Sequence, residues 1–382
     1  MSTEAHAVTA PSSNNAIVIF LRKPINWFLL FIPLTVALEH VHSIPAPVLF
    51  FSAAVAIVPI AALIVAATEQ LSTRTGDAIG GLLNATFGNA PELIISLVAL
   101  KAGYLDMVRA SLAGAILANL LMALGVAFLL GGLRFKEQRF NPVATRAYST
   151  MMFVAAVSLT VPSAFNRAFA TDLGPIREEK MLNIGIAFLL LIAYGLYLLF
   201  SLKTHPHAFA SVASEDGGGG HELDEHWSVA RAVITLVLAS LGAAWMSEIL
   251  VGAAEGTGKA LGMSQVFIGI VFVAIVGGAA ESGSAIAMGR KNKMDLSVGI
   301  ALGSCIQIAL FVAPVLVLAS YFIAPRPLEL AFGRAEIGSL FMAVLCGALV
   351  CGDGQSNWYK GIQLLTVYAI IALMFYFMPA AS

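Results

Sequence analysis

The sequence GGLLNATFGNAPEL, residues 80–93, places a proline and a carboxylate inside an apolar run of membrane-spanning length. Its acidic part returns 189 residues further on, because Gly88-Asn89-Ala90-Pro91-Glu92 aligns with Gly277-Gly278-Ala279-Ala280-Glu281. The same offset aligns Asp106 with Asp295, Gly114 with Gly303 and Leu121 with Leu310. A carboxylate in the middle of a hydrocarbon-spanning segment costs several kcal/mol, so acids at equivalent points of an internal repeat predict a cation site.

The composition is that of a membrane protein. Hydrophobic residues make up 59% of the 382 residues and charged residues only 11%, against roughly 25% charged in soluble domains. A net charge of −1 without a basic tract argues against a nucleic-acid partner. The three cysteines lie in apolar stretches without metal-site spacing, so neither a zinc site nor a disulfide framework is indicated. No cofactor is expected.

Apolar segments of about 20 residues predict an all-α polytopic membrane protein with about eleven transmembrane helices. The expected ranges are 26–42, 46–72, 77–102, 105–133, 147–168, 181–203, 229–256, 265–290, 294–323, 334–351 and 358–379. The first helix stands alone, and the others form two sets of five. Because five is odd, the second set enters the membrane from the opposite side, which predicts two inverted five-helix repeats.

This pattern divides the chain into four parts. Residues 1–45 hold an N-terminal tail and the first helix, 46–203 the first repeat, and 229–382 the second. Between the repeats, the acidic and histidine-containing stretch 204–228 cannot bury a core and is expected to be a flexible linker. The excess of Lys and Arg on one side favours a cytoplasmic N-terminus and a cytoplasmic linker. The short tails favour a bacterial inner membrane, and the sequence leaves the oligomeric state open.

Glu92 and Glu281 are the centre of the predicted site. Small residues crowd both motifs and allow the helices to unwind locally, so that backbone carbonyls face a buried ion. Asn89 lies three residues before Glu92, on the same helical face. Hard cations such as calcium bind six to eight oxygens from carboxylates, amides, hydroxyls and carbonyls. Residues of these types are present in both segments.

Further polar residues lie at a matched depth in the helices that follow: Asn119 in the first repeat, and Ser304 with Gln307 in the second. Each is either a cation ligand or the donor of an interhelical hydrogen bond, and the sequence leaves both interpretations open. Two more intramembrane acids, Glu69 and Glu248, precede the motifs. We expect them to hydrogen-bond to the neighbouring motif helix or to relay protons.

Two runs of the sequence resemble the calcium/proton antiporters of the cation/calcium exchanger superfamily. Residues 80–93 are similar to the first acidic repeat of that family, and residues 293–296 with 303–314 are similar to the stretch after the second. The resemblance extends from about Val48 to the end of the chain, and it implies eleven helices with an acidic loop between the sixth and seventh. It also implies site residues: calcium ligation by Glu92 and Glu281 with help from Asn89, Ser304 and Gln307, and a proton-linked role for Glu69 and Glu248.

The second motif departs from the family pattern Gly-Asn-Ala-Ala-Glu-His. Gly278 stands where the family has asparagine, and Ser282 stands where it has histidine. The missing amide removes one oxygen from the ligand set. Weaker calcium binding, or a selectivity broadened toward sodium or manganese, is therefore expected.

Together these features predict a secondary antiporter that exchanges Ca²⁺, or a related cation, for H⁺ across a lipid bilayer and serves calcium homeostasis. Alternating access would take place around the paired glutamates near the midplane. A sodium/calcium exchanger is one alternative, since it shares the architecture. Such proteins carry Pro-Glu motifs in both repeats, however, and here only Pro91 matches them. A broader Na⁺(Ca²⁺, Mn²⁺)/H⁺ antiporter is a second alternative.

Two classes outside the transporters are less consistent with the sequence. A cation channel also lines its pore with acids, but an inverted repeat with a midplane pair favours occlusion of an ion over conduction. A membrane enzyme would need a nucleophile, a metal-binding histidine cluster or a cofactor motif, and the predicted spans contain none of these.

Overall fold

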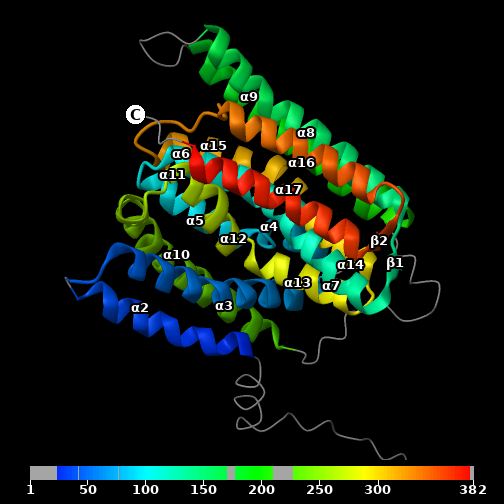
Figure 1. Ribbon diagram of the computed structural model, residues 1–382, viewed down its shortest axis with the longest axis horizontal. Helices are drawn as coiled ribbons and strands as arrows, with labels where there is room; N and C mark the ends of the chain where they lie inside the picture. Colours follow the sequence, from blue (N-terminus) through cyan, green and yellow to red (C-terminus); the bar gives the residue numbers. More distant parts are fainter. Residues whose placement is uncertain (1–23, 42, 76, 170–176, 210–226, 379–382) are drawn as a thin grey trace, which may run out of the picture.

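The protein is described by a computed structural model that covers residues 24–41, 43–75, 77–169, 177–209 and 227–378 (Figure 1). The first half comprises η1 (Pro24–Leu30), α2 (Phe31–Glu39), α3 (Ala46–Ser72), α4 (Asp77–Phe87), α5 (Ala90–Lys101), α6 (Leu105–Leu117), η2 (Ala118–Ala123), α7 (Leu124–Phe135), α8 (Pro142–Phe169), α9 (Arg177–Leu199), η3 (Phe200–Thr204) and η4 (Pro206–Phe209). The second half comprises α10 (Val229–Leu261), α11 (Gln265–Phe267), η6 (Ile268–Val273), α12 (Ala274–Gly277), α13 (Ala279–Arg290), α14 (Met294–Gln307), η7 (Ile308–Val312), α15 (Ala313–Ile323), α16 (Arg334–Cys351) and α17 (Trp358–Phe377).

The helices begin and end within about five residues of the expected ranges, with the largest differences at α8 and α10. Helix α8 begins at Pro142 instead of 147, and α10 continues to Leu261 instead of ending at 256. The first expected span, 26–42, holds a 3₁₀ turn followed by the short helix α2. Among the described residues, eight helices are long and apolar enough to cross a membrane, or nine if the bent pair is one span. The number of eleven crossings therefore stays a prediction.

Both acidic motifs lie on broken helices, whereas the ranges 77–102 and 265–290 were each expected as one segment. The first break falls at Gly88 and Asn89, between α4 and α5. The second falls at Gly278, where the chain bends by 61°. Pro91 occupies the first turn of α5, where its missing N–H costs no helical hydrogen bond. A helix that starts within the protein directs its first N–H groups toward the space beside the break.

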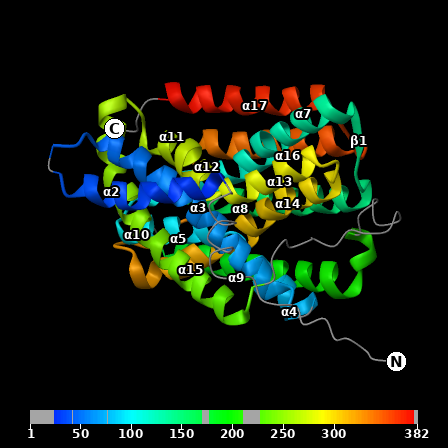
Figure 2. The same cartoon turned by 90° about the horizontal axis from the view of Figure 1, so that it is seen from below.

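The helices form layers, with the broken helices in the middle. Helices α3 and α10 pack against each other along one edge, with α2 outside α3, while α8, α9, α16 and α17 lie on the opposite side (Figures 1 and 2). Close packing in the middle depends on small residues. A Cβ on Gly114 would lie only 2.2 Å from the carbonyl oxygen of Ile270, so glycine lets α6 approach the backbone of η6.

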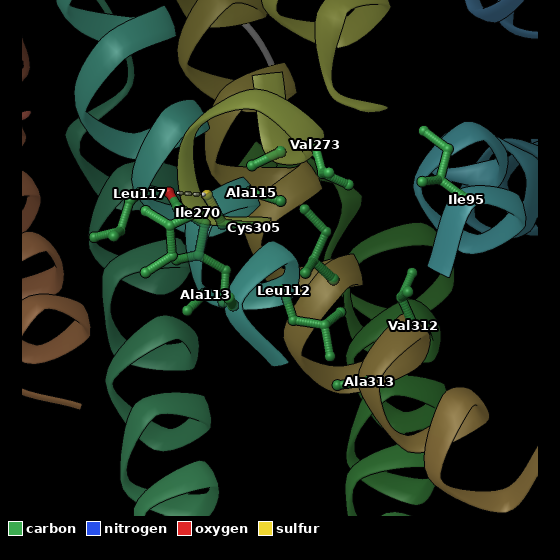
Figure 3. Packing of buried hydrophobic residues seen from close by; sticks show 14 of the residues in the cluster. Ile95, Leu112, Ala113, Ala115, Leu117, Ile270, Val273, Cys305, Val312 and Ala313 are labelled. Atoms are coloured by element: carbon green, nitrogen blue, oxygen red, sulfur yellow. Dashed lines mark hydrogen bonds between the residues drawn. The ribbon is translucent and has the colours of Figure 1, made fainter. Parts of the chain in front are cut away.

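An apolar core surrounds the breaks. Figure 3 shows Leu112 and Ala115 of α6 near Val273 of η6, and it marks the 3.5 Å contact between Cys305 Sγ and the carbonyl oxygen of Ile116. These residues are almost fully buried. Dense packing allows few alternative positions, so the core holds the broken helices in register.

A two-stranded antiparallel sheet joins the loops before α8 and α17. It pairs β1 (Glu137–Arg139) with β2 (Gln355–Asn357). The buried Gln138 of β1 donates to the carbonyl oxygen of Gly289 and to Asn292 Oδ1, each at 2.9 Å, and so ties the sheet to the end of α13. Most of the expected linker, residues 210–226, lies outside the described residues. The division of the chain into a lone helix and two repeats stays a prediction.

Candidate cation site

The two motif glutamates occupy corresponding positions just after the two helix breaks. Glu92 lies in the first turn of α5, and Glu281 lies in the first turn of α13. Both side chains are buried, with 6% and 8% of their surface exposed. Neither carboxylate has a hydrogen-bond partner among the described residues. An ionised carboxylate is costly to bury in this way, so both groups are suited to hold a cation or a proton.

The second break lies directly against Glu92. A Cβ on Gly277 would be 2.9 Å from Glu92 Cγ, and a Cβ on Gly278 would be 3.4 Å from Glu92 Oε1. Glycine at 277 therefore leaves room for the carboxylate of the other motif. The fold thus brings the two acidic motifs together, although 189 residues separate Glu92 from Glu281 in the sequence.

Five polar side chains form one continuous run of hydrogen bonds beside the glutamates, which we call the polar chain. Ser282 Oγ donates to Asn119 Oδ1 at 3.2 Å, and Asn119 Nδ2 donates to Ser304 Oγ at 3.1 Å. Ser304 Oγ then donates to Asn89 Oδ1 at 2.7 Å, and Asn89 Nδ2 donates to Gln307 Oε1. The chain connects the first break, η2, α13 and α14, so it crosses between the two halves of the molecule.

The sequence left open whether Asn119, Ser304 and Gln307 bind the cation or form hydrogen bonds between helices, and the polar chain answers the second part. Asn119, Ser304 and Gln307 all take part in hydrogen bonds between helices. Ser304 and Gln307 also line the same cavity as Glu281. A ligand role is compatible with these bonds, because a carbonyl or hydroxyl oxygen has a second lone pair. Cation ligation by these residues stays a prediction.

A partly open cavity of about 330 Å³, which we call the vestibule, is lined in part by Glu281. Its wall also carries Glu69 and Asp295, which place two further carboxylates along the approach to Glu281. Asn84, also in the wall, is exposed. The vestibule therefore offers a polar path from the surface to one of the two central acids.

Glu92 faces a very different space. The cavity next to it measures about 10 Å³ and is lined largely by apolar groups, among them Ala115, Val273 and Ile308. A space of this size holds about one water molecule. Glu281 thus lines a wide cavity, whereas Glu92 lines a very small one.

The two supporting acids that the sequence predicted are separated by the structure. Glu69 of α3 lines the vestibule together with Glu281. Glu248 of α10 lies on an exposed face of its helix and lines neither the vestibule nor the pocket at Glu92. The structure therefore does not bring Glu248 to the site, since its side chain lies on the exposed face of α10.

Ser282 is a site residue that sequence reasoning missed. The sequence marked it only as a departure from a family motif, yet it is buried and donates into the polar chain. The available signal was its position directly after Glu281, on a helix that enters the site. Its partner Asn119 is 163 residues away, and sequence spacing does not reveal such a contact.

A family model described as sodium/calcium exchanger protein matches residues 45–203 and 231–377. The chain belongs to the sodium/calcium exchanger family. This exchanger is 39% identical over 367 residues to a Ca(2+)/H(+) antiporter of Aphanothece halophytica, covering 92% of this chain and 95% of the relative. It is 42% identical over 352 residues to the Ca(2+)/H(+) antiporter ChaA of Bacillus subtilis strain 168, covering 90% and 96%.

A solved structure agrees with the fold of the exchanger. The structure of native YfkE matches with a TM-score of 0.77 and 38% identity, covering 92% of this chain and 100% of the other. The predicted family and the predicted all-α membrane fold are therefore confirmed.

Proposed function

We propose that this exchanger is a secondary antiporter that exchanges Ca²⁺ for H⁺ by alternating access around Glu92 and Glu281. The observation that carries the proposal is the pair of buried carboxylates, one from each motif, that lack hydrogen-bond partners among the described residues. Similarity over nine tenths of the chain to proteins named Ca(2+)/H(+) antiporter supports the choice of ions.

Coupling follows from competition for the same oxygens. A carboxylate coordinates a divalent cation in its ionised form, and a proton occupies the same lone pairs when the cation leaves. Two such groups in a low-dielectric site are costly to leave charged and empty. The protein therefore changes the side to which the site opens only when the site holds either the cation or protons, and this exchange is antiport. This transport uses the chain's own side chains, and we propose neither a resident cofactor nor an enzymatic reaction.

The two cavities supply the geometry for alternating access. In the described conformation Glu281 lines the wide vestibule, while the cavity at Glu92 holds about one water molecule. A movement that closes the vestibule and opens the pocket would expose the same pair of acids to the other side. Glu69 is placed to receive protons or to attract the cation on the vestibule side.

A broader ion selectivity is the second candidate, and Gly278 is the observation that favours it. Glycine at this position contributes no side-chain oxygen, so the ligand set is smaller on the side of the second motif. Sodium or manganese would then compete with calcium. We further propose a location in a bacterial inner membrane with the N-terminus in the cytoplasm, based on the bacterial relatives and the distribution of Lys and Arg.

Everted membrane vesicles test the proposed function. An imposed pH gradient should drive Ca²⁺ uptake by the wild-type protein, and Glu92→Gln or Glu281→Gln should reduce uptake to the level of vesicles without the protein. Ser158→Ala is the matched control, because the hydroxyl of Ser158 makes an exposed hydrogen bond within its own helix α8, at 2.9 Å from the Val154 carbonyl oxygen. Its uptake should equal that of the wild type.

Changing the ions in the same uptake assay distinguishes between the alternative functions. Uptake that requires a sodium gradient and ignores the pH gradient would favour a sodium/calcium exchanger, and single-channel currents would favour a channel. Manganese or sodium transport driven by the pH gradient would favour the broader antiporter. Wild-type uptake in either glutamate variant, at equal amounts of inserted protein, would refute the proposal.

A further inference from the structure

The polar chain runs in one direction from donor to acceptor. Ser282 donates to Asn119, which donates to Ser304, which donates to Asn89, which donates to Gln307. Asn119 and Asn89 each accept through the amide oxygen and donate through the amide nitrogen, and Gln307 accepts through its oxygen. The orientation of every member therefore depends on the member before it, and Ser282 is the first.

The polar chain has no equivalent in the other repeat, although the two glutamates are equivalent. Under the 189-residue offset, Glu92 and Glu281 are equivalent. The counterparts of Ser282, Asn119, Ser304, Asn89 and Gln307 are, in the same order, Leu93, Ile308, Ala115, Gly278 and Ala118. None of these counterparts can continue a side-chain hydrogen-bond network. The hydrogen bonds that orient these amides therefore have no counterpart under the repeat.

Gly278 makes Asn119 a direct neighbour of the site. A Cβ on Gly278 would lie 3.4 Å from Glu92 Oε1 and 3.8 Å from Asn119 Nδ2. A single point beside the second break is therefore within 4 Å of both groups. A larger side chain at 278 would occupy this space. In this chain it is left to Glu92 and the amide of Asn119.

We propose that Ser282 is a positioning residue of the cation site, and this inference rests on the proposed function. By donating to Asn119 Oδ1, Ser282 fixes the amide with its nitrogen toward Ser304, and this sets the direction of the remaining bonds down to Gln307. The amide oxygens of Asn119 and Asn89 are thereby ordered before a divalent cation binds. Ordered ligands reduce the entropic cost of binding, so Ser282 raises the affinity for the cation without touching it.

Transport kinetics with Ser282 variants test the inference. Ser282→Ala removes the donor, and Ser282→Cys keeps nearly the same shape but donates only weakly. Both should raise the KM for Ca²⁺ by roughly three- to tenfold, the value of one neutral hydrogen bond, while kcat stays close to that of the wild type. Ser282→Thr keeps the hydroxyl and should restore most of the affinity. A role in packing alone predicts instead that Cys behaves like Ser.

A double variant shows whether Ser282 acts through Asn119. If it does, Ser282→Ala combined with Asn119→Ala should have the same KM as Asn119→Ala alone, because the partner is already missing. Additive effects, an unchanged KM in the Ala and Cys variants, or an equal rise in KM for Thr and Ala would each overturn the inference. Loss of transport in Glu92→Gln with a normal KM in Ser282→Ala would reject only this inference, whereas normal transport in Glu92→Gln would reject the proposed function.

Discussion

Neighbouring glycines at the second break differ in how much space they leave for Glu92. A methyl group on Gly277 would meet Glu92 Cγ at 2.9 Å, so the buried side chain has to move. A methyl group on Gly278 would lie 3.4 Å from Glu92 Oε1, which is close to ordinary van der Waals contact. We therefore expect Gly277→Ala to lower the initial rate of pH-driven Ca²⁺ uptake at least about tenfold, since displacement of a positioned group by about 1 Å is costly.

Gly278→Ala serves as the matched comparison in the same assay and should keep most of the wild-type rate. The two variants differ only in which of two adjacent residues receives the methyl group. Equal rates in both, at equal protein levels, would show that the carboxylate of Glu92 is not confined as the structure describes.

The structure also distinguishes two acidic residues for which the sequence predicted the same role. Glu69 lines the vestibule, whereas Glu248 lies on an exposed face of α10. We expect Glu69→Gln to slow proton-coupled Ca²⁺ uptake several-fold and to change its dependence on pH, because it removes a titrating group next to the path. Glu248→Gln should leave the pH profile unchanged. The reverse pattern would contradict the placement of these acids.

Among the elements, α6 and η6 pack closely together and both line the pocket at Glu92. A Cβ on Gly114 would lie 2.2 Å from the Ile270 carbonyl oxygen, and backbone atoms cannot easily move away. Gly303, its equivalent in the second repeat, lies in the vestibule wall, and a Cβ added there would meet no described atom within 4 Å. Gly114→Ala should destabilise this conformation by about 1–3 kcal/mol, and Gly303→Ala should have little effect.

Thermal unfolding of the detergent-purified variants measures this difference. A clear drop in Tm is expected for Gly114→Ala, and a Tm near that of the wild type for Gly303→Ala. If the two variants unfold at the same temperature, the close contact of α6 with η6 does not hold this conformation together.

Element types and most boundaries were accessible from the sequence, because a run of about 20 apolar residues has few alternatives to a membrane helix. The glycines around Glu92 and Glu281 also indicated where helices could unwind. The exact break and the 61° bend at Gly278 were not predictable, since they depend on packing against Glu92 of the other motif. The polar chain could not be predicted from the sequence for the same reason. Its bonds join residues up to 218 positions apart.

The sequence also did not show which face of α10 carries Glu248. Its position within an apolar helix suggested a role in transport, but the direction of a side chain depends on which face of α10 packs against α3 and α5. Glu69 lines a cavity with Glu281 of the second motif, and its proton-linked role stays a prediction. An intramembrane acid thus indicates function only together with the face on which it lies.

For the whole molecule, an internal repeat supplies the two acids, while the surroundings of those acids differ. One acid faces a polar vestibule of about 330 Å³, and the other faces a mostly apolar pocket of about 10 Å³. Under the proposed mechanism, the equivalence of the glutamates would let the same pair serve both sides of the membrane, and the difference between their surroundings would distinguish the two sides. This combination is what alternating access requires.

The central claim is that Glu92 and Glu281 together hold a divalent cation for which protons compete. Equilibrium binding of radioactive ⁴⁵Ca²⁺ to the purified protein, measured over a range of pH, tests it most directly. The account predicts saturable binding that decreases as the pH falls and that disappears in both Glu92→Gln and Glu281→Gln. Binding that is independent of pH, or that survives in either variant, would contradict it.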